Sequence, residues 1–303
     1  MSISRRRFLG LTAGALAGSA VPAEASQDRH GIDDEKAYGV LVDTVICIGC
    51  RKCEWACNDE HGLSDRPLTE YEDKSVFADN RRPHAKAYTV VNQFSDPAKE
   101  GEAGRRWIKV QCMHCNRPAC VSACIVGAFR KDPSGPVVYD AWKCIGCRYC
   151  MVACPFQIPA YEYERAVEPR VMKCSFCADR LQEGKRPACV AICPNEALTF
   201  GTRAELFQVA HERFMAHPDR YLHHIYGEHE AGGTSWMYLV PCDFEHTELP
   251  ALSETPPPDR TEPIQHGIFK GFVPPLALYG LLGLAMYVQR QKRQGEGEGD
   301  ERA

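Results

Sequence analysis

The feature of this sequence that most constrains its fold is a run of four closely spaced cysteines followed by proline. The run is Cys144-Ile-Gly-Cys-Arg-Tyr-Cys-Met-Val-Ala-Cys154-Pro155, in which two, two and three residues separate the thiols. Three thiolates on such a tight loop can take three corners of one cubic iron–sulfur cluster, and the fourth points away toward a second cluster. We therefore expect clusters to supply part of the core, with folding coupled to metal binding.

Similar spacing recurs four times along the chain. Sixteen of the 17 cysteines fall into four groups of four, and every group ends in C-x3-C. The groups are Cys47, Cys50, Cys53 and Cys57; Cys112, Cys115, Cys120 and Cys124; Cys144, Cys147, Cys150 and Cys154; and Cys174, Cys177, Cys189 and Cys193. Sixteen thiolates match four [4Fe–4S] clusters with four ligands each. Spacing alone does not say which groups share a cluster.

Other uses of so many cysteines fit the pattern less well. A zinc site needs two ligand pairs separated by a longer span, which the first and third groups lack. Neighbours in C-x2-C-x2-C are poorly placed to form disulfides with one another. No C-x-x-C-H occurs, which disfavours c-type haem attachment. The 36 basic and 40 acidic residues give a net charge of −4, so no basic surplus indicates nucleic acid.

Residues 37–202 hold all four groups and are expected to form the cluster-binding domain. Apolar runs predict strands at 40–45, 107–110, 137–139, 171–173 and 197–200. Short helices are expected near the fourth cysteine of each group, and the polar segment 58–111 is interpreted as a surface excursion. Residues 203–263 form an extension, with a helix predicted over 203–216 and Thr202 as its N-cap. Irregular, His-rich sequence and a Pro-rich spacer complete this extension.

The two ends of the chain carry targeting and membrane signals. Residues 1–25 combine the twin-arginine pattern Ser4-Arg-Arg-Arg-Phe-Leu9, an apolar run and an Ala23-Glu-Ala25 cleavage motif, and residues 26–36 follow as a linker. The uncharged 17-residue run Phe272–Val288 would reach roughly 26 Å as a helix. With its flanks, 264–290, it predicts a single transmembrane anchor, and the basic residues behind it place the tail, 291–303, in the cytoplasm. The alternative is a buried core helix.

Outside the four groups the sequence shows little chemistry. His114, between Cys112 and Cys115, either tunes a cluster by hydrogen bonding or only packs. Cys242 stands alone and is expected to be an inert thiol. We find no nucleophile–base set, phosphate loop or substrate-pocket signature, so the visible chemistry is one-electron transfer.

In its four cysteine motifs the chain resembles the four-cluster ferredoxin subunits of exported respiratory oxidoreductases, and among them the HybA type that serves periplasmic nickel–iron hydrogenase 2. The narrower resemblance depends on Lys109-Val-Gln-Cys-Met-His-Cys115, Gly201-Thr-Arg-Ala-Glu-Leu206, Ile264-Gln-His266 and a single C-terminal span. It implies an α+β fold of two ferredoxin-like dicluster modules in pseudo-twofold arrangement plus one C-terminal transmembrane helix. One departure is Ile125, where proline often follows that ligand in the family.

The resemblance also implies how the cysteines are shared. Groups one and four, and groups two and three, would exchange their last ligands. The resulting ligand sets, numbered first to fourth, would be Cys47, Cys50, Cys53 and Cys193; Cys174, Cys177, Cys189 and Cys57; Cys112, Cys115, Cys120 and Cys154; and Cys144, Cys147, Cys150 and Cys124.

The function implied by the resemblance is electron transfer on the periplasmic face of the cytoplasmic membrane. Electrons from hydrogenase small and large subunits would pass along the clusters to an integral membrane partner that reduces quinone. The chain itself would have no catalytic site. The same conduit could serve a molybdopterin enzyme, either a formate dehydrogenase or a sulfur-compound reductase. A cluster-based redox sensor is the alternative from a different class.

Overall fold

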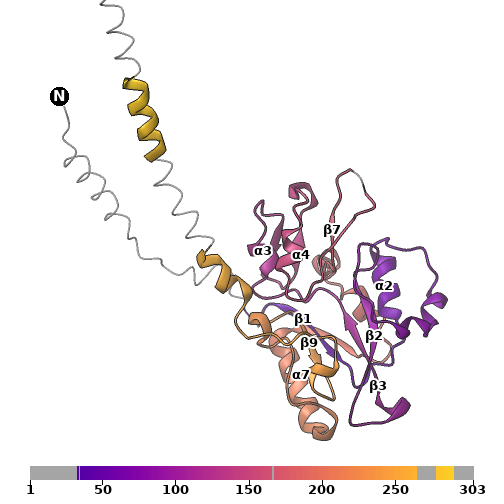
Figure 1. Ribbon diagram of the computed structural model, residues 1–303. Coiled ribbons are helices and arrows are strands. Elements are labelled where there is room, and N and C mark those ends of the chain that lie inside the picture. The colour runs from indigo at the N-terminus through magenta and orange to yellow at the C-terminus, as the bar shows by residue number, and fades with distance from the viewer. Residues whose placement is uncertain (1–32, 34, 166, 265–277, 290–303) are drawn as a thin grey trace, which may run out of the picture. The chain divides into compact units, whose positions relative to one another are not determined.

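A three-stranded sheet joins the beginning and the end of the cysteine-containing region. The computed structural model describes residues 33, 35–165, 167–264 and 278–289, which all belong to the unit Ile32–Ala303 (Figure 1). Strand β1 (Tyr38–Asp43) is central, antiparallel to β8 (Leu198–Thr202) and parallel to β9 (Trp236–Leu239). Its residue Val40 therefore has Phe200 as its partner on one side and Trp236 on the other.

One face of this sheet is covered by helix α7 (Arg203–Ala216). The helix begins with a capping box, in which Thr202 Oγ1 accepts from the Glu205 N–H at 3.3 Å and the Glu205 carboxylate accepts from the Thr202 N–H at 2.8 Å. The predicted helix over 203–216 and its N-cap are confirmed. Because side chains alternate along a strand, Leu41 faces α7 and packs against Leu206 in a cluster that contains no cysteine.

The opposite face of the sheet borders the cysteines. Val40 and Val42 of β1, with Trp236 and Tyr238 of β9, belong to a buried cluster that also includes thiols from the second and fourth cysteine groups. All four of these sheet residues are buried to 1% exposure or less. The sheet thus separates an ordinary apolar core from a core that contains thiols.

Antiparallel hairpins and short helices carry the cysteine groups. The hairpins pair β2 (Val90–Ser95) with β3 (Arg105–Val110), β4 (Phe129–Lys131) with β5 (Val137–Tyr139), and β6 (Ala160–Tyr161) with β7 (Val171–Met172). The α-helices are α2 (Lys52–Glu60), α3 (Ala119–Ser122), α4 (Tyr149–Ala153), α5 (Ala178–Gln182) and α6 (Ala188–Ala191). The 3-10 helices are η1 (Leu68–Glu72), η2 (Ser75–Ala78), η3 (Gly101–Gly104), η4 (Ala141–Lys143), η5 (Pro218–Arg220), η6 (Glu230–Gly232) and η7 (Phe244–His246).

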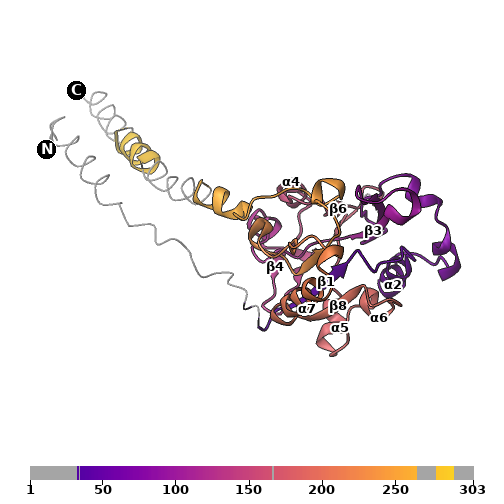
Figure 2. The same cartoon turned by 90° about the horizontal axis from the view of Figure 1, so that it is seen from below.

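The helices near the cysteines contact one another in two pairs. Helix α2 packs on α6, and α3 packs on α4. In both views the α2 region and the α4 region lie on different sides of the molecule (Figures 1 and 2). The mixed α and β content agrees with the prediction, as do the predicted strands, each of which overlaps an observed strand, and the short helices near the fourth cysteines.

Two segments are more ordered than the sequence predicted. The interpretation of 58–111 as a surface excursion is wrong for its second half, because β2 lies there and Val90 and Val91 are buried. The His-rich segment after α7 is likewise not irregular throughout, since it contains β9, whose four residues are fully buried. In both cases the polar residues nearby hid a short apolar run, and the partner strand of β9 is also far away in sequence.

The predicted terminal segments lie largely outside the described residues. The proposed signal segment, 1–25, and the tail, 291–303, are among them. Residues 257–264 form a helix, which is attached to the core by ion pairs from Arg117 to Asp259 and Glu262. Residues 278–289 of the predicted anchor are helical and their side chains are exposed. Among the described residues no helix has both the length and the apolar character needed to cross a membrane.

Candidate iron–sulfur site

The backbone around each cysteine pair has a recurrent left-handed residue. The residue before the second cysteine of each group has a positive φ: Gly49 (62°), His114 (49°), Gly146 (71°) and Phe176 (60°). Glycine adopts this conformation without strain, whereas other residues need it to be held by their surroundings, at a cost on the order of 1–3 kcal/mol. At Gly49 an added Cβ would also lie 2.5 Å from the ring of Trp107.

This conformation turns backbone N–H groups toward the thiols. The Gly146 N–H donates to Cys144 Sγ at 3.4 Å, and the Phe176 N–H donates to Cys174 Sγ at 3.3 Å. Concave arrangements of successive N–H groups are typical of anion and iron–sulfur sites, because they stabilise negative charge on the sulfurs. The local backbone therefore fits thiolate ligands.

The first predicted set comes together around one cavity. Cys47, Cys50 and Cys53, from the loop after β1 and the start of α2, line it together with Cys193 from the end of α6. Cys193 is 140 residues from Cys53 in the chain, and the pairing of β1 with β8 brings the two regions together. Burial raises the pKa of Cys47 to about 11, with Cys193 and Cys50 as the nearest thiols that add to this rise.

The second set also joins the two outer groups. Cys57 on α2 is buried, and burial raises its pKa well above the ordinary value. The neighbouring thiols that raise the pKa of Cys57 further are those of Cys174, Cys189 and Cys177. The packing of α2 on α6 explains this, since Cys189 lies on α6.

The third and fourth sets join the two inner groups in the same way. Burial raises the pKa of Cys115 well above its ordinary value, and the thiols of Cys154, Cys112 and Cys120 contribute next. Burial raises the pKa of Cys150 to about 11, and the thiols around it are those of Cys144, Cys124 and Cys147. In each set that the resemblance implied, some thiols thus lie near enough to influence one another's pKa, and the four complete ligand sets stay a prediction.

Single thiols connect each of the four sets with the next. Cys53 of the first set lies near Cys189 of the second. Cys174 of the second set lies near Cys112 of the third, and the two share a buried cluster. Cys120 of the third set and Cys150 of the fourth belong to another buried cluster. A series of adjacent thiol sets therefore runs from the β1 loop to the α3–α4 region.

The donor chemistry fits iron–sulfur clusters. All 17 cysteines are free thiols in the structure. At least one thiol of each set has a pKa raised by burial and by neighbouring thiols, so four thiolates would need a cation between them. Within the residues that the structure describes, no three His, Cys, Asp or Glu side chains converge as they would on one metal ion. Thiolates in sets of four are the usual ligands of [4Fe–4S] clusters.

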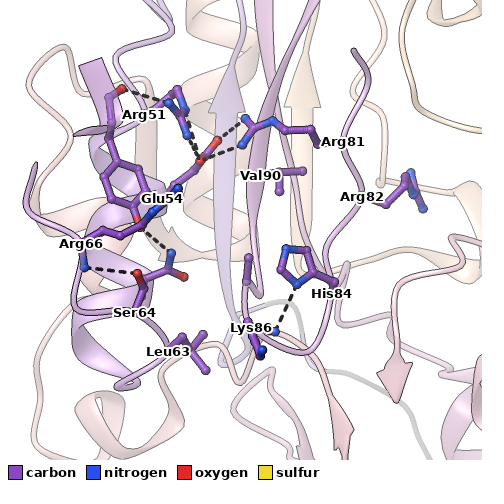
Figure 3. A pocket seen from close by; sticks show the side chains of 13 residues that line it. Arg51, Glu54, Leu63, Ser64, Arg66, Arg81, Arg82, His84, Lys86 and Val90 are labelled. Atoms are coloured by element: carbon purple, nitrogen blue, oxygen red, sulfur yellow. Dashed lines mark hydrogen bonds and ion pairs between the residues drawn. The ribbon is translucent and has the colours of Figure 1, made fainter. Parts of the chain in front are cut away.

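A buried carboxylate that the sequence analysis missed holds α2 in place. Glu54, with a side chain 4% exposed, accepts from Arg51 Nη2 at 3.0 Å and from Arg81 Nη2 at 2.6 Å (Figure 3). It also accepts from the Val91 N–H at 2.6 Å. It borders a cavity of about 520 Å³ that is lined mostly by basic and polar residues. No local sequence pattern predicts this role, because Arg81 and Val91 belong to the polar segment 58–111, far from Glu54 in the sequence.

Three lysines also lie deep among the thiol sets and were not singled out in the sequence. Lys109 and Lys173 are buried, and Lys131 is partly buried. Lysine is almost never fully buried without a partner, so their position needs an explanation.

The two other residues named from the sequence have modest environments. The Val137 N–H donates to His114 Nδ1 at 2.8 Å, and the ring packs edge-on against Phe176. Burial, followed by the charges of Lys173 and Lys131, lowers the pKa of His114 well below its ordinary value, so the ring is neutral. Burial raises the pKa of Cys242 to about 11, as expected of an inert thiol.

Comparison with known proteins agrees with this geometry. Residues 106–203 match the family described as a 4Fe-4S dicluster domain. A protein of Nitratidesulfovibrio vulgaris is 48% identical over 253 residues, covering 82% of this chain and 67% of the relative. The hydrogenase-2 operon protein HybA of Escherichia coli O157:H7 is 36% identical over an alignment of 332 positions that spans 98% of each chain.

A further relative is the iron-sulfur subunit of the nitrate-inducible formate dehydrogenase of Escherichia coli K12. It is 34% identical over 250 residues, which cover 80% of each chain. With thiol sets of cluster type and relatives of this kind, the chain is an iron–sulfur protein that carries [4Fe–4S] clusters. It belongs to the family of 4Fe–4S dicluster proteins that includes HybA and the formate dehydrogenase iron–sulfur subunits.

Proposed function

We propose that this chain is an electron-transfer subunit that holds four [4Fe–4S] clusters in the four nested thiol sets. The observation that supports the proposal is that a thiol of each predicted set lies near a thiol of the next. Bound there, the clusters supply one-electron chemistry. The chain's own residues supply the thiolates, the N–H groups that stabilise them, and a buried path that excludes water. It has no catalytic site of its own.

The proposed source of electrons is a nickel–iron hydrogenase, through its small subunit. This is supported by the relative named for the hydrogenase-2 operon, whose alignment extends over 98% of both chains. The second candidate is a formate dehydrogenase, supported by an alignment that covers 80% of each chain. The catalytic subunit that co-purifies with the native protein distinguishes the two.

The surface around the fourth set supports contact with a partner there. Cys147 is the one exposed cysteine of the 17, so this set lies nearest to solvent. Around it in sequence, Trp142 is 92% exposed, Val152 82%, Ile125 66% and Ile145 61%. Exposed apolar side chains gathered near one site are typical of protein interfaces. We propose that a redox partner docks at this end of the line and exchanges electrons with the fourth set.

The membrane assignment remains part of the proposal. The twin-arginine pattern supports export to the periplasm, and the apolar run 272–288 supports a single anchor with its C-terminus in the cytoplasm. The apolar, exposed side chains of residues 278–289 are consistent with burial in lipid. Electrons would leave to an integral membrane subunit that reduces quinone.

Iron analysis and electron paramagnetic resonance test the proposal. Anaerobically purified protein should contain about sixteen irons and as many acid-labile sulfides, from four ligands per [4Fe–4S] cluster. Stepwise reduction should then reveal four interacting clusters. Protein that holds zinc with little iron, or that forms disulfides, would contradict the proposed function.

A further inference from the structure

Three lysine ammonium groups lie among the thiol sets without a carboxylate partner. Within the described part of the chain, Lys109, Lys131 and Lys173 form no ion pair with Asp or Glu, and their hydrogen bonds go to neutral oxygens. Burying an ammonium ion away from water is costly unless an anion compensates it. The thiolates of the neighbouring sets, or the clusters they hold, are therefore the available counter-charge.

Lys109 has fewer hydrogen-bond acceptors around its ammonium group than the other two lysines have. Its Nζ donates to Gln111 Oε1 at 3.0 Å and lies 4.4 Å from the centre of the Trp236 ring. In contrast, Lys131 donates to two carbonyls and a hydroxyl, and Lys173 donates to two carbonyls. The charge of Lys109 is thus the least satisfied by protein dipoles.

Lys109 also lies between two thiol sets. It lines the same cavity as Cys53 and the rest of the first set. The thiols of Cys189 and Cys174, from the second set, also lie close enough to influence its charge. Burial lowers the pKa of Lys109 and the surrounding thiols raise it, with a net rise above its ordinary value.

We propose that Lys109 is a fixed positive charge shared by the first two clusters, which raises the reduction potential of both. The proposal rests on the proposed function, since it requires clusters in these sets. Reduction adds one negative charge to a cluster, and a cation held nearby in a dry, low-dielectric interior stabilises that charge strongly. Lys109 would not ligate iron. It would act through its charge, by setting the reduction potentials of the first and second clusters.

Lys131 provides a comparison within the same protein. Lys131 lies near Cys115 and Cys112 of the third set. Replacing Lys131 should therefore affect the third cluster and leave the first unchanged, because charge effects in a protein interior decrease with distance.

The test is a potentiometric titration of the four-cluster protein followed by electron paramagnetic resonance. Lys109→Met removes the charge and keeps the length of the side chain. We expect at least a tenfold shift of the reduction equilibrium toward the oxidised form at two clusters, about 59 mV for a one-electron couple. The signals altered in Cys47→Ser and Cys177→Ser identify these as the first and second clusters. Lys109→Arg, which keeps the charge, should restore both potentials.

Gln111→Leu is the matched control for a purely structural effect. It removes the hydrogen-bond acceptor of Lys109 and the donor to the Tyr238 hydroxyl, and leaves the charge in place. Equal shifts in Gln111→Leu and Lys109→Met, or unshifted potentials in Lys109→Met, would overturn the proposal. If Lys109→Met and Lys109→Gln both fail to hold iron while Lys109→Arg holds it at wild-type potentials, the need for the charge is supported.

These outcomes are separable from failure of the proposed function. Wild-type protein without [4Fe–4S] signals would refute the function and this inference together. Wild-type protein with four titrating clusters, two of which ignore the loss of Lys109, would refute the inference alone.

Discussion

Replacing the buried carboxylate Glu54 by glutamine should loosen helix α2 and accelerate loss of iron. Helix α2 carries Cys53 of the first set and Cys57 of the second, so its opening exposes ligands of both. Removing one partner from a buried ion pair costs about 3–5 kcal/mol. Arg81 is 26% exposed and Arg51 keeps the carbonyls of Tyr71 and Asp73, so we expect the lower end, about 3 kcal/mol.

That loss of stability corresponds to a roughly 100-fold larger population of molecules in which α2 is open, since every 1.4 kcal/mol is a factor of ten. The assay is anaerobic decay of visible cluster absorbance in the presence of an iron chelator. When opening is fast relative to iron capture, the decay rate follows the open population. Glu54→Gln should therefore lose iron about two orders of magnitude faster than wild type.

Glu70→Gln is the matched control, because it makes the same chemical change in an exposed pair. Glu70 lies 3.2 Å from Arg66, with side chains 51% and 64% exposed. Exposed pairs contribute about 1 kcal/mol or less, so the rate should change by less than about fivefold. Similar rates for both variants, or a wild-type rate for Glu54→Gln, would refute the view that Glu54 holds α2.

Three further predictions concern the ligands, the docking surface and the anchor. Cys193→Ser should alter the resonance of the cluster held by Cys47 and its neighbours, whereas damage confined to the second cluster would contradict the nested sets. Trp142→Ala should slow electron exchange with the partner at unchanged iron content, while Met215→Ala, equally apolar and 83% exposed on α7, should not; equal effects would remove the case for a specific surface. A stop codon at Gly267 should release four-cluster protein into the periplasm and sharply lower quinone reduction. Truncated protein that stays membrane-bound without partners would contradict the anchor.

The cysteine loops could be predicted from sequence because their chemistry is local. Spacing of two and three residues fixes which thiols share a loop, and the backbone then repeats a left-handed residue at Gly49 and Gly146. The capping box at Thr202 is equally local, since donor and acceptor lie within three residues. The nesting of the sets is not local, and only the resemblance to a family suggested it.

The features that escaped prediction all depend on contacts between distant segments. Strand β9 pairs in parallel with β1, which lies almost 200 residues earlier in the sequence, so no residue near Trp236 indicates the partner strand. The Glu54 network needs Arg81 and Val91, which arrive from a segment whose composition is mostly polar. Lys109 was visible only as part of a motif, because a buried cation cannot be distinguished from a surface one by spacing.

The two faces of the central sheet differ in how they depend on metal. The cluster under α7 is built from Leu41, Leu206, Phe214, Met237 and similar side chains, and contains no thiol. The clusters on the other side include buried cysteines of the second, third and fourth groups, with the partly buried Cys53 of the first group packed against them, so we expect their packing to be complete only when those thiols are held together. Metal binding is thus coupled to folding on one face and not on the other. Side chains of β1 point to both faces of the sheet. We therefore expect the packing of β1 against α7 to position the end of β1, where the loop that carries Cys47 begins. The β1–β8 pairing brings the segment that carries Cys193 close to the loop that carries Cys47, so we expect the sheet to guide the predicted pairing of the outer groups.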